Sequence, residues 1–219
     1  MKNLIIFIPS IENAGVEKNL FIICNFLIKK IDKIYLITAN NNFNKRLDKN
    51  IHVVCPKNKF WNNKSRLLKT MYCFFLIIKK FEKKNYLLFS FQANFVATII
   101  AKIYEYKLVL RLNTSPNKYI HNSFQRIFFK IIYKSADQII VNSKKFKNLL
   151  KKKLNIDSIF IYNPLISKYK IKTPIKKIKK NLNILNIGRL TDQKDQLTLL
   201  KALDLLKKNK IKFTAKIIG

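Results

Sequence analysis

The segment Asn186–Asp195 (NIGRLTDQKD) holds residue types suited to binding a diphosphate. Gly188 permits a tight turn, Arg189 brings a planar fork of N–H donors, and Lys194 follows near the start of an expected helix. Backbone N–H groups and the helix dipole converge at such a helix N-terminus, so added cations favour phosphate there. The alternative is a solvated loop in a lysine-rich chain.

A second candidate anion site is the segment Ile11–Lys18 (IENAGVEK). Gly15 allows a ligand to approach the backbone closely, and Glu17 in the first helical turn suits the helix dipole. An ordinary strand-to-helix turn with a stabilising glutamate explains the same residues. Both segments need a strand before them and a helix after them.

The sequence supplies such elements almost throughout, because short apolar runs alternate with amphipathic stretches. Continuous apolar strands separated by helices indicate a parallel sheet covered on both faces, which predicts a doubly wound α/β fold. The expected strands are 3–9, 33–38, 51–55, 86–91, 107–112, 138–141, 158–162, 182–187 and 212–218. The expected helices are 16–30, 64–84, 94–104, 121–134, 144–154 and 195–208.

The alternation is interrupted after Asn163-Pro164 by a lysine-rich stretch that contains Pro174 and lacks an apolar face. We therefore predict a domain over 1–165, a basic linker over 166–181 and the first strand–helix–strand unit of a second domain over 182–219. A unit of under forty residues cannot bury both faces of its sheet. The second domain is accordingly expected to be truncated.

Four segments in order resemble glycosyltransferases of the GT-B fold, and family four in particular. They are AGVEKNL after the first strand, ADQIIVNSK in mid-chain, IYNPL before the linker, and LNIGRLTDQKDQLTLLKAL. The resemblance implies two Rossmann-like domains that face a cleft. The first would bind the acceptor, and the second a nucleotide-diphosphate sugar without a metal ion.

The resemblance also implies roles for individual residues. Arg189 and Lys194 would hold the donor diphosphate and stabilise its charge as the glycosidic bond breaks, which is electrostatic catalysis. Gly188 would shape that donor site, and Gly15 would present backbone N–H groups to the diphosphate or the sugar.

Three further residues are implied on the acceptor side: Glu17, Arg111 and Asn113. Arg111 and Asn113 stand where the family often has a histidine that touches the sugar; this sequence has RLNTSP there. Ser143 follows the strand 138–141 and is expected to be a structural N-cap.

The largest departure from the family is the lack of a pair of glutamates, seven residues apart, that bind the donor. By position they would lie beyond Gly219, together with the nucleotide-base pocket. The resemblance therefore implies an incomplete and inactive glycosyltransferase, whose acceptor would be a glycan or a lipid-linked sugar.

The charge of the chain suggests other partners. There are 45 basic against 11 acidic residues, a formal net charge of +34, which points to nucleic acid or an anionic membrane. Only five basic residues are arginine and no recognition motif is present, so we expect compositional drift and no nucleic-acid partner.

Membrane contact is a separate hypothesis. Aromatic residues stand among cations in the interval 57–75 and could form an amphipathic surface for anionic lipid. The alternative is that Tyr72, Phe74 and Phe75 face the core. The residues concerned are Phe60, Trp61, Tyr72, Phe74 and Phe75, with Lys57, Lys59, Lys64 and Arg66.

The three cysteines are far apart and no CxxC pair or histidine cluster accompanies them, so neither a disulfide framework nor a metal site is expected. No signal peptide is recognised, and no apolar run approaches the ~18 residues of a membrane span. We expect a cytoplasmic protein, with peripheral contact at the inner face of the membrane as an option. The alternative functions are a non-catalytic basic membrane-surface or anion-binding protein and another GT-B enzyme such as an epimerase.

Overall fold

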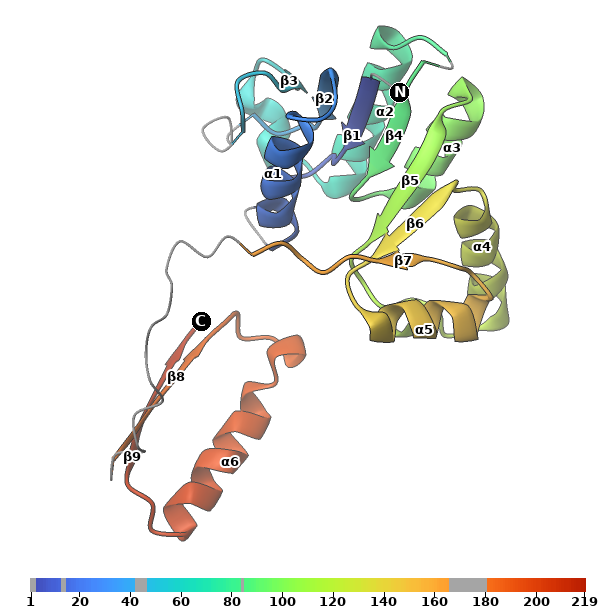
Figure 1. Cartoon of the computed structure of the whole chain (residues 1–219). Coiled ribbons are helices and arrows are strands. Elements are labelled where there is room, and N and C mark those ends of the chain that lie inside the picture. The colour runs from blue at the N-terminus through green and yellow to red at the C-terminus, as the bar shows by residue number, and fades with distance from the viewer. Residues whose placement is uncertain (1–2, 13–14, 42–46, 84, 166–180) are drawn as a thin grey trace. The chain divides into compact units, whose positions relative to one another are not determined.

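The computed structural model describes residues 3–12, 15–41, 47–83, 85–165 and 181–219. The chain forms two compact units, Met1–Leu165 and Ile166–Gly219 (Figure 1). The first unit is a helix-covered parallel sheet, and the second is a pair of strands with one helix.

The sheet of the first unit has seven strands in the order β3-β2-β1-β4-β5-β6-β7, and every neighbouring pair is parallel. The chain starts at β1 in the middle, winds outward to β3, crosses back to β4 and continues to the other edge. This arrangement confirms the doubly wound α/β prediction. The strands are β1 Asn3–Phe7, β2 Lys33–Ile37, β3 His52–Val54, β4 Leu87–Ser90, β5 Lys107–Leu112, β6 Gln138–Val141 and β7 Ile159–Phe160.

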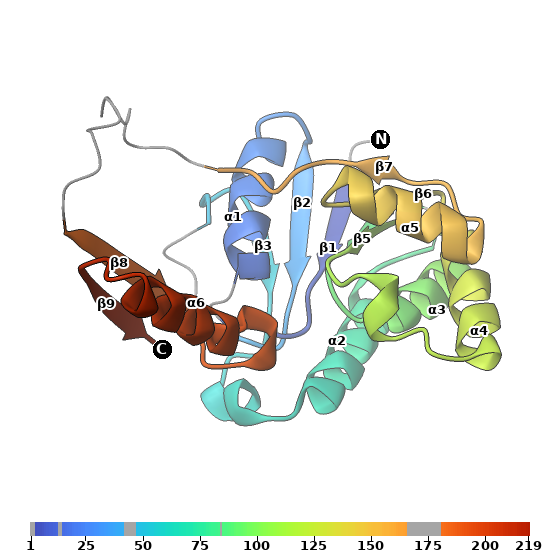
Figure 2. The ribbon, with the colours of Figure 1, turned by 90° about the horizontal axis from the view of Figure 1, so that it is seen from below.

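Helices cover both faces of this sheet, and α1 lies on the side opposite to α2, α3 and α4 (Figure 2). One apolar core forms between α1 and residues of β1, β2 and β4, and the other between the same sheet and α2, α3 and α5. The helices are α1 Gly15–Leu27, α2 Arg66–Lys80, α3 Asn94–Tyr104, α4 Ser123–Lys134 and α5 Lys144–Leu154, with short 3₁₀ turns η2 Lys59–Asn63 and η3 Pro116–Lys118.

Helix boundaries differ from the expected ones where a side chain caps the first turn. The helix expected over 64–84 begins at Arg66, because the Ser65 hydroxyl accepts a hydrogen bond from the backbone N–H of Leu68, and it ends at Lys80. The helix expected from residue 121 begins at Ser123, since Asn122 caps it in the same way.

The second unit contains β8 Leu182–Ile187, the 3₁₀ turn η4 Asp192–Lys194, α6 Gln196–Lys208 and β9 Phe213–Ile218. The two strands are parallel, with Leu182 opposite Phe213. Asp195 precedes α6 in the left-handed region (φ 49°), and its carboxylate accepts a hydrogen bond from the N–H of Thr198. The helix expected from residue 195 therefore begins one residue later.

The predicted linker lies outside the described residues except for Asn181, which is exposed. In the described part of the chain, no helix combines the length and the hydropathy needed to cross a bilayer.

Candidate functional site

Ligands of open parallel sheets bind outside the carboxyl ends of the strands, where the loops into the helices begin. In the first unit that edge holds the loops after β1, β4, β5 and β6. In the second unit it holds the turn between β8 and α6. All the residues predicted from the sequence as ligand-binding lie in or beside these loops.

The loop after β1 is organised by a charged pair. The Glu12 carboxylate accepts two hydrogen bonds from the Arg66 guanidinium of α2, with 2.7 Å between Arg66 Nε and Glu12 Oε1. The hydrogen bond from Arg66 lowers the pKa of Glu12 to about 2, against an opposing effect of burial, and the Ser10 hydroxyl contributes in the same direction as Arg66. The pair joins the first loop to the start of α2.

A buried lysine lies beside this pair. Lys69 of α2 is 4% exposed, and its ammonium donates to the backbone carbonyl of Asn62 at 2.9 Å and to the Ser10 hydroxyl at 3.5 Å. The buried amide oxygen of Asn40 accepts a hydrogen bond from the N–H of Ile11 at 3.0 Å. This edge therefore contains a fixed polar network with a positive charge inside it.

The two predicted residues at the start of α1 differ in their surroundings. Gly15 is exposed, and a Cβ atom placed on it would meet no atom within 4 Å, so the space beside this backbone is open. Glu17 is buried and its carboxylate accepts a hydrogen bond from the N–H of Glu12 at 3.4 Å. Glu17 thus supports the loop itself.

Arg111 and Asn113 meet around one aromatic ring. Arg111 lies inside β5 at 2% exposure, and its guanidinium carbon is 5.7 Å from the centroid of Phe91. The Asn113 amide donates to the Phe91 carbonyl at 3.0 Å. Arg111 Nη2 donates to the Asn163 side chain at 2.8 Å.

Burial of Arg111 has an electrostatic consequence. Desolvation lowers the pKa of the guanidinium, and its Nε atom is buried with no hydrogen-bond partner among the described residues. A buried cation is costly unless it is paired. The strand end therefore holds an arginine that is charged, enclosed and incompletely hydrogen-bonded.

Ser143 follows β6 at the same edge. Its hydroxyl accepts a hydrogen bond from the N–H of Phe146 at 3.2 Å, so the expected N-cap of α5 is confirmed.

The turn of the second unit brings Gly188 and Lys194 together. A Cβ atom on Gly188 would lie 3.6 Å from Cδ of Lys194, so the lysine stem runs across the glycine. The backbone N–H of Lys194 donates to the Thr191 carbonyl at 2.8 Å, which folds the turn back. Arg189 is exposed, and its backbone carbonyl accepts a hydrogen bond from the Gln196 side chain at 3.0 Å.

Sequence reasoning missed Glu12, Arg66 and Lys69 as members of one polar network. Glu12 stood beside the predicted glycine, but Arg66 was grouped with the surface cations, and Lys69 is one of many lysines. No local signal marks a pair whose members are 54 residues apart.

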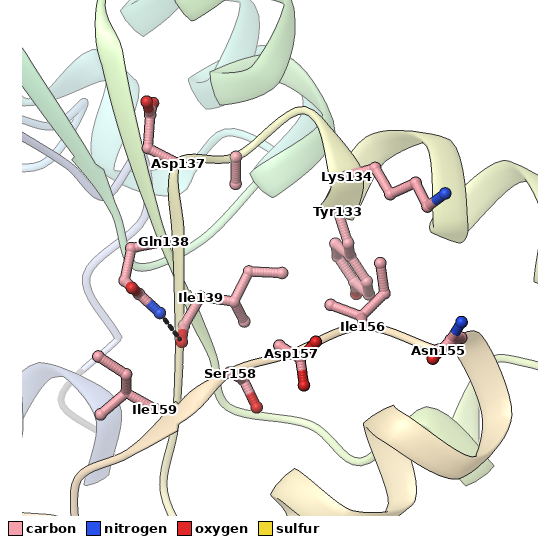
Figure 3. Close-up of a pocket in the computed structure, with 11 residues that line it drawn as sticks. Tyr133, Lys134, Asp137, Gln138, Ile139, Asn155, Ile156, Asp157, Ser158 and Ile159 are labelled. Atoms are coloured by element: carbon pink, nitrogen blue, oxygen red, sulfur yellow. Dashed lines mark hydrogen bonds between the residues drawn. The ribbon is translucent and has the colours of Figure 1, made fainter.

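A cavity of about 430 Å³ lies at the amino ends of the strands, where β6 and β7 begin (Figure 3). Gln138, whose side chain donates to the Ile139 carbonyl, and the loop 155–158 line it. Asp137 in its wall accepts a hydrogen bond from the N–H of Leu108 and so serves the sheet. The amino ends of parallel strands are the less favourable side for a ligand, and we assign no site here.

The described residues contain no group of three or more histidine, cysteine or acidic side chains placed to hold a metal ion. Cys24, Cys55 and Cys73 are free thiols. Burial raises the pKa of Cys24 to about 12 and also raises those of Cys73 and Cys55, which disfavours the reactive thiolate.

No protein-family model matches the sequence, and no curated protein does. Solved structures do match. HepE from Anabaena in complex with UDP and glucose superposes with a TM-score of 0.63 and 16% identity over 99% of this chain and 60% of HepE. TarM superposes with a TM-score of 0.65 and 10% identity, over 100% of this chain and 72% of TarM. The lipopolysaccharide outer core galactosyltransferase WaaB superposes with a TM-score of 0.58 and 15% identity, over 100% of this chain and 68% of WaaB.

These structures are GT-B glycosyltransferases, and the chain has the GT-B fold, as the sequence resemblance implied. The identities lie below the level at which function follows from similarity. The chain spans 60% of the length of HepE.

Proposed function

We propose that this chain belongs to a retaining glycosyltransferase resembling family four, which transfers a sugar from a nucleotide-diphosphate sugar to a glycan or lipid-linked acceptor. The observation that carries the proposal is the turn Gly188–Lys194, at the carboxyl end of a parallel strand and before a helix, in a chain of the GT-B fold. HepE was solved with UDP and glucose, which supports a donor of this class.

In this proposal Arg189 and Lys194 bind the donor diphosphate. When the bond between the sugar and the diphosphate breaks, negative charge develops on the phosphate oxygens, and the two cations stabilise it. The N-terminus of α6 adds its helix dipole. The two cations would supply the charge that a metal ion supplies elsewhere, so we propose a metal-independent reaction.

The acceptor side is proposed in the first unit. Gly15 borders open space and offers its backbone to the donor diphosphate or sugar. Arg111 and Asn113 occupy the end of β5. The buried Glu17 acts by holding the loop in which Gly15 stands.

The donor site is tested by isothermal titration of UDP and of pyrophosphate into the purified chain. We expect the R189A and K194A variants to weaken both ligands about 10- to 100-fold, because each loses a charge-assisted contact. K201A is the matched control, since Lys201 is an exposed cation on α6 outside the turn. Failure of the wild type to bind, or unchanged binding by the R189A/K194A double variant, would contradict the site.

The same titration tests the proposal that the base pocket and the paired glutamates are not in this chain. Without a base pocket, UDP and pyrophosphate should bind with affinities within about threefold of each other. A UDP affinity more than tenfold higher would show that the pocket is present. Turnover of a nucleotide sugar by the chain on its own would contradict the proposed incompleteness while leaving the donor site intact.

A further inference from the structure

Helix α4 presents an apolar stripe to solvent. Phe124, Ile127, Phe128 and Ile131 are exposed, with Phe124 at 77% and Ile131 at 59%. Their spacing of three and four residues places them within about 100° of arc on one helix face. The helix contacts the core through another face, where Ile132 and Tyr133 are buried. The stripe is therefore a second apolar face, which nothing in the described part of the first unit covers.

The stripe continues onto the neighbouring helix. The ring of Phe95 on α3 lies 5.5 Å from that of Phe128, and Ile103 on the same helix is also exposed. α3 and α4 pack side by side on the same side of the sheet (Figure 2). Contiguous exposed apolar surface of this kind marks an interaction site.

The charges around the stripe all have one sign. The sequences of α2, α3 and α4 contain no aspartate or glutamate, and α4 carries Arg126, Lys130 and Lys134. Beside α4, a cavity of about 710 Å³ is lined by His121, Arg126, Lys152 and Lys153, with no acidic residue in its wall. Cations thus lie on α4 itself and around the cavity on its flank.

We propose that the α3–α4 surface docks this protein on an anionic lipid bilayer. The stripe Phe124, Ile127, Phe128 and Ile131 enters the boundary between headgroups and acyl chains, and the cations of α4 and α5 contact the lipid phosphates. An amphipathic helix with large apolar residues on one face and lysine or arginine beside it has the composition that binds such interfaces. The proposal is independent of the donor site.

Charge complementarity distinguishes this occupant from two others. A second copy seated on the stripe would bring Lys130 and Lys134 against the same cations, and like charges disfavour that contact. Nucleic acid would satisfy the cations but would leave four large apolar side chains uncovered. An anionic bilayer would pair with the cations through its phosphates and would also cover the apolar side chains.

The sequence placed the membrane surface in the interval 57–75, and the structure alters that picture. Trp61 stacks on Tyr72 with 4.3 Å between ring centroids, and both pack against the core, as Phe74 does. Phe75 is 60% exposed, so only two of the three aromatic residues expected in the core face it. The α4 stripe, on the helix that the sequence predicted over 121–134, is the better surface.

Vesicle co-sedimentation tests the proposal with phosphatidylcholine vesicles and with vesicles containing about one-third phosphatidylglycerol, at low and high salt. We expect the wild-type chain to bind the anionic vesicles and to bind less at high salt. The F124S/I131S variant should bind about tenfold or more weakly, because two large apolar side chains no longer enter the bilayer. K152A/K153A should reduce the preference for anionic vesicles.

The matched control is F26S, since Phe26 is an exposed aromatic residue on α1, which covers the other side of the sheet. Circular dichroism confirms that each variant is folded, and the single variant F124S replaces the double one if the latter unfolds. Absence of wild-type binding to anionic vesicles at low salt would overturn the proposal. Equal binding by wild type and F124S/I131S, or an equal loss in F26S, would do so as well.

Discussion

At the level of single residues, the loop after β1 is fixed by an ion pair that spans most of the unit's first half. Glu12 and Arg66 form two hydrogen bonds, and the adjacent Ser10 hydroxyl donates to the same carboxylate at 3.1 Å. Both side chains of the pair remain largely accessible to water, so its contribution to stability is limited to about 1 kcal/mol or less. The pair joins the loop after β1 to the start of α2.

This pair gives the unfolding free energy a pH dependence. The pKa of Glu12 is lowered to about 2 in the folded state, from about 4.5, mainly by the hydrogen bond from Arg66. Its stabilisation is therefore fully present above about pH 5 and is lost as the pH falls through 4.5 towards 2. In urea unfolding, the difference between wild type and E12Q should be constant above pH 5 and shrink below it.

A double-mutant cycle provides the control for that experiment. R66Q should lose the same pH-dependent difference, and E12Q/R66Q should lose little more than either single variant. A wild-type minus E12Q difference that stays constant down to pH 2.5 would contradict the lowered pKa.

Arg111 illustrates a residue whose role depends on burial. The family resemblance implied a role for Arg111 on the acceptor side, yet the residue is 2% exposed and its guanidinium lies over the Phe91 ring. Its hydrogen bond to Asn163 ties β5 to the segment that follows β7. Asn163 therefore accounts for one of the guanidinium nitrogens of this buried arginine.

At the level of elements, the helices begin where short polar side chains cap them. Ser65, Asn122 and Ser143 each accept a hydrogen bond from an N–H in the first turn, and Asp195 does the same for α6. Such caps are local, so they can be read from sequence; Ser143 was predicted in this way. The other caps moved helix starts by one or two residues.

The cap of α5 gives a direct prediction. S143A should lower the unfolding free energy by about 0.5–2 kcal/mol in urea denaturation, because the N–H of Phe146 loses its acceptor. S143D retains an oxygen acceptor and should stay within about 0.5 kcal/mol of wild type. An S143A variant as stable as wild type would show that the cap contributes nothing.

The outward stripe of α4 shows what helical periodicity leaves open. Apolar residues at spacings of three and four identify a face, but α4 has two such faces. One holds Ile132 and Tyr133 against the core, and the other holds Phe124 and Ile131 in solvent. Which of the two faces is buried depends on how α4 packs against α3 and α5. Both of these helices lie outside the α4 segment of the sequence.

At the level of the whole molecule, the two units differ in their cores. The first has two apolar clusters, one on each side of its sheet. Among the described residues 181–219 of the second unit, Leu203 is the one buried apolar side chain, at 9% exposure. Leu185, Ile187 and Leu197 are exposed there, because two strands and one helix cannot enclose them.

The second unit should therefore open far more readily than the first. In native-state hydrogen exchange, amides of β8 and β9 should exchange about 100-fold or more faster than those of β1 and β4, which lie in the middle of the seven-stranded sheet. UDP or pyrophosphate should slow exchange around η4 if the donor site is correct. Equal protection of β8 and β1 would show that the second unit is stabilised by contacts outside its own core.

The net charge of +34 also belongs to the whole molecule. Arg189 and Lys194 have a proposed chemical role, and the cations around α4 have a proposed lipid surface. The buried Lys69 belongs to the network after β1. The remaining excess is consistent with the compositional drift expected from the sequence.

The sequence by itself determined the order of strands and helices, the doubly wound α/β class and the turn Gly188–Lys194, because each depends on residues that are neighbours along the chain. Tertiary structure alone decided that Glu12 meets Arg66, that Arg111 is enclosed beside Phe91 and that the stripe of α4 faces solvent. Those features depend on which distant elements pack together. Residue type and periodicity are the same whether a side chain is covered or exposed, so only the packed fold distinguishes the two.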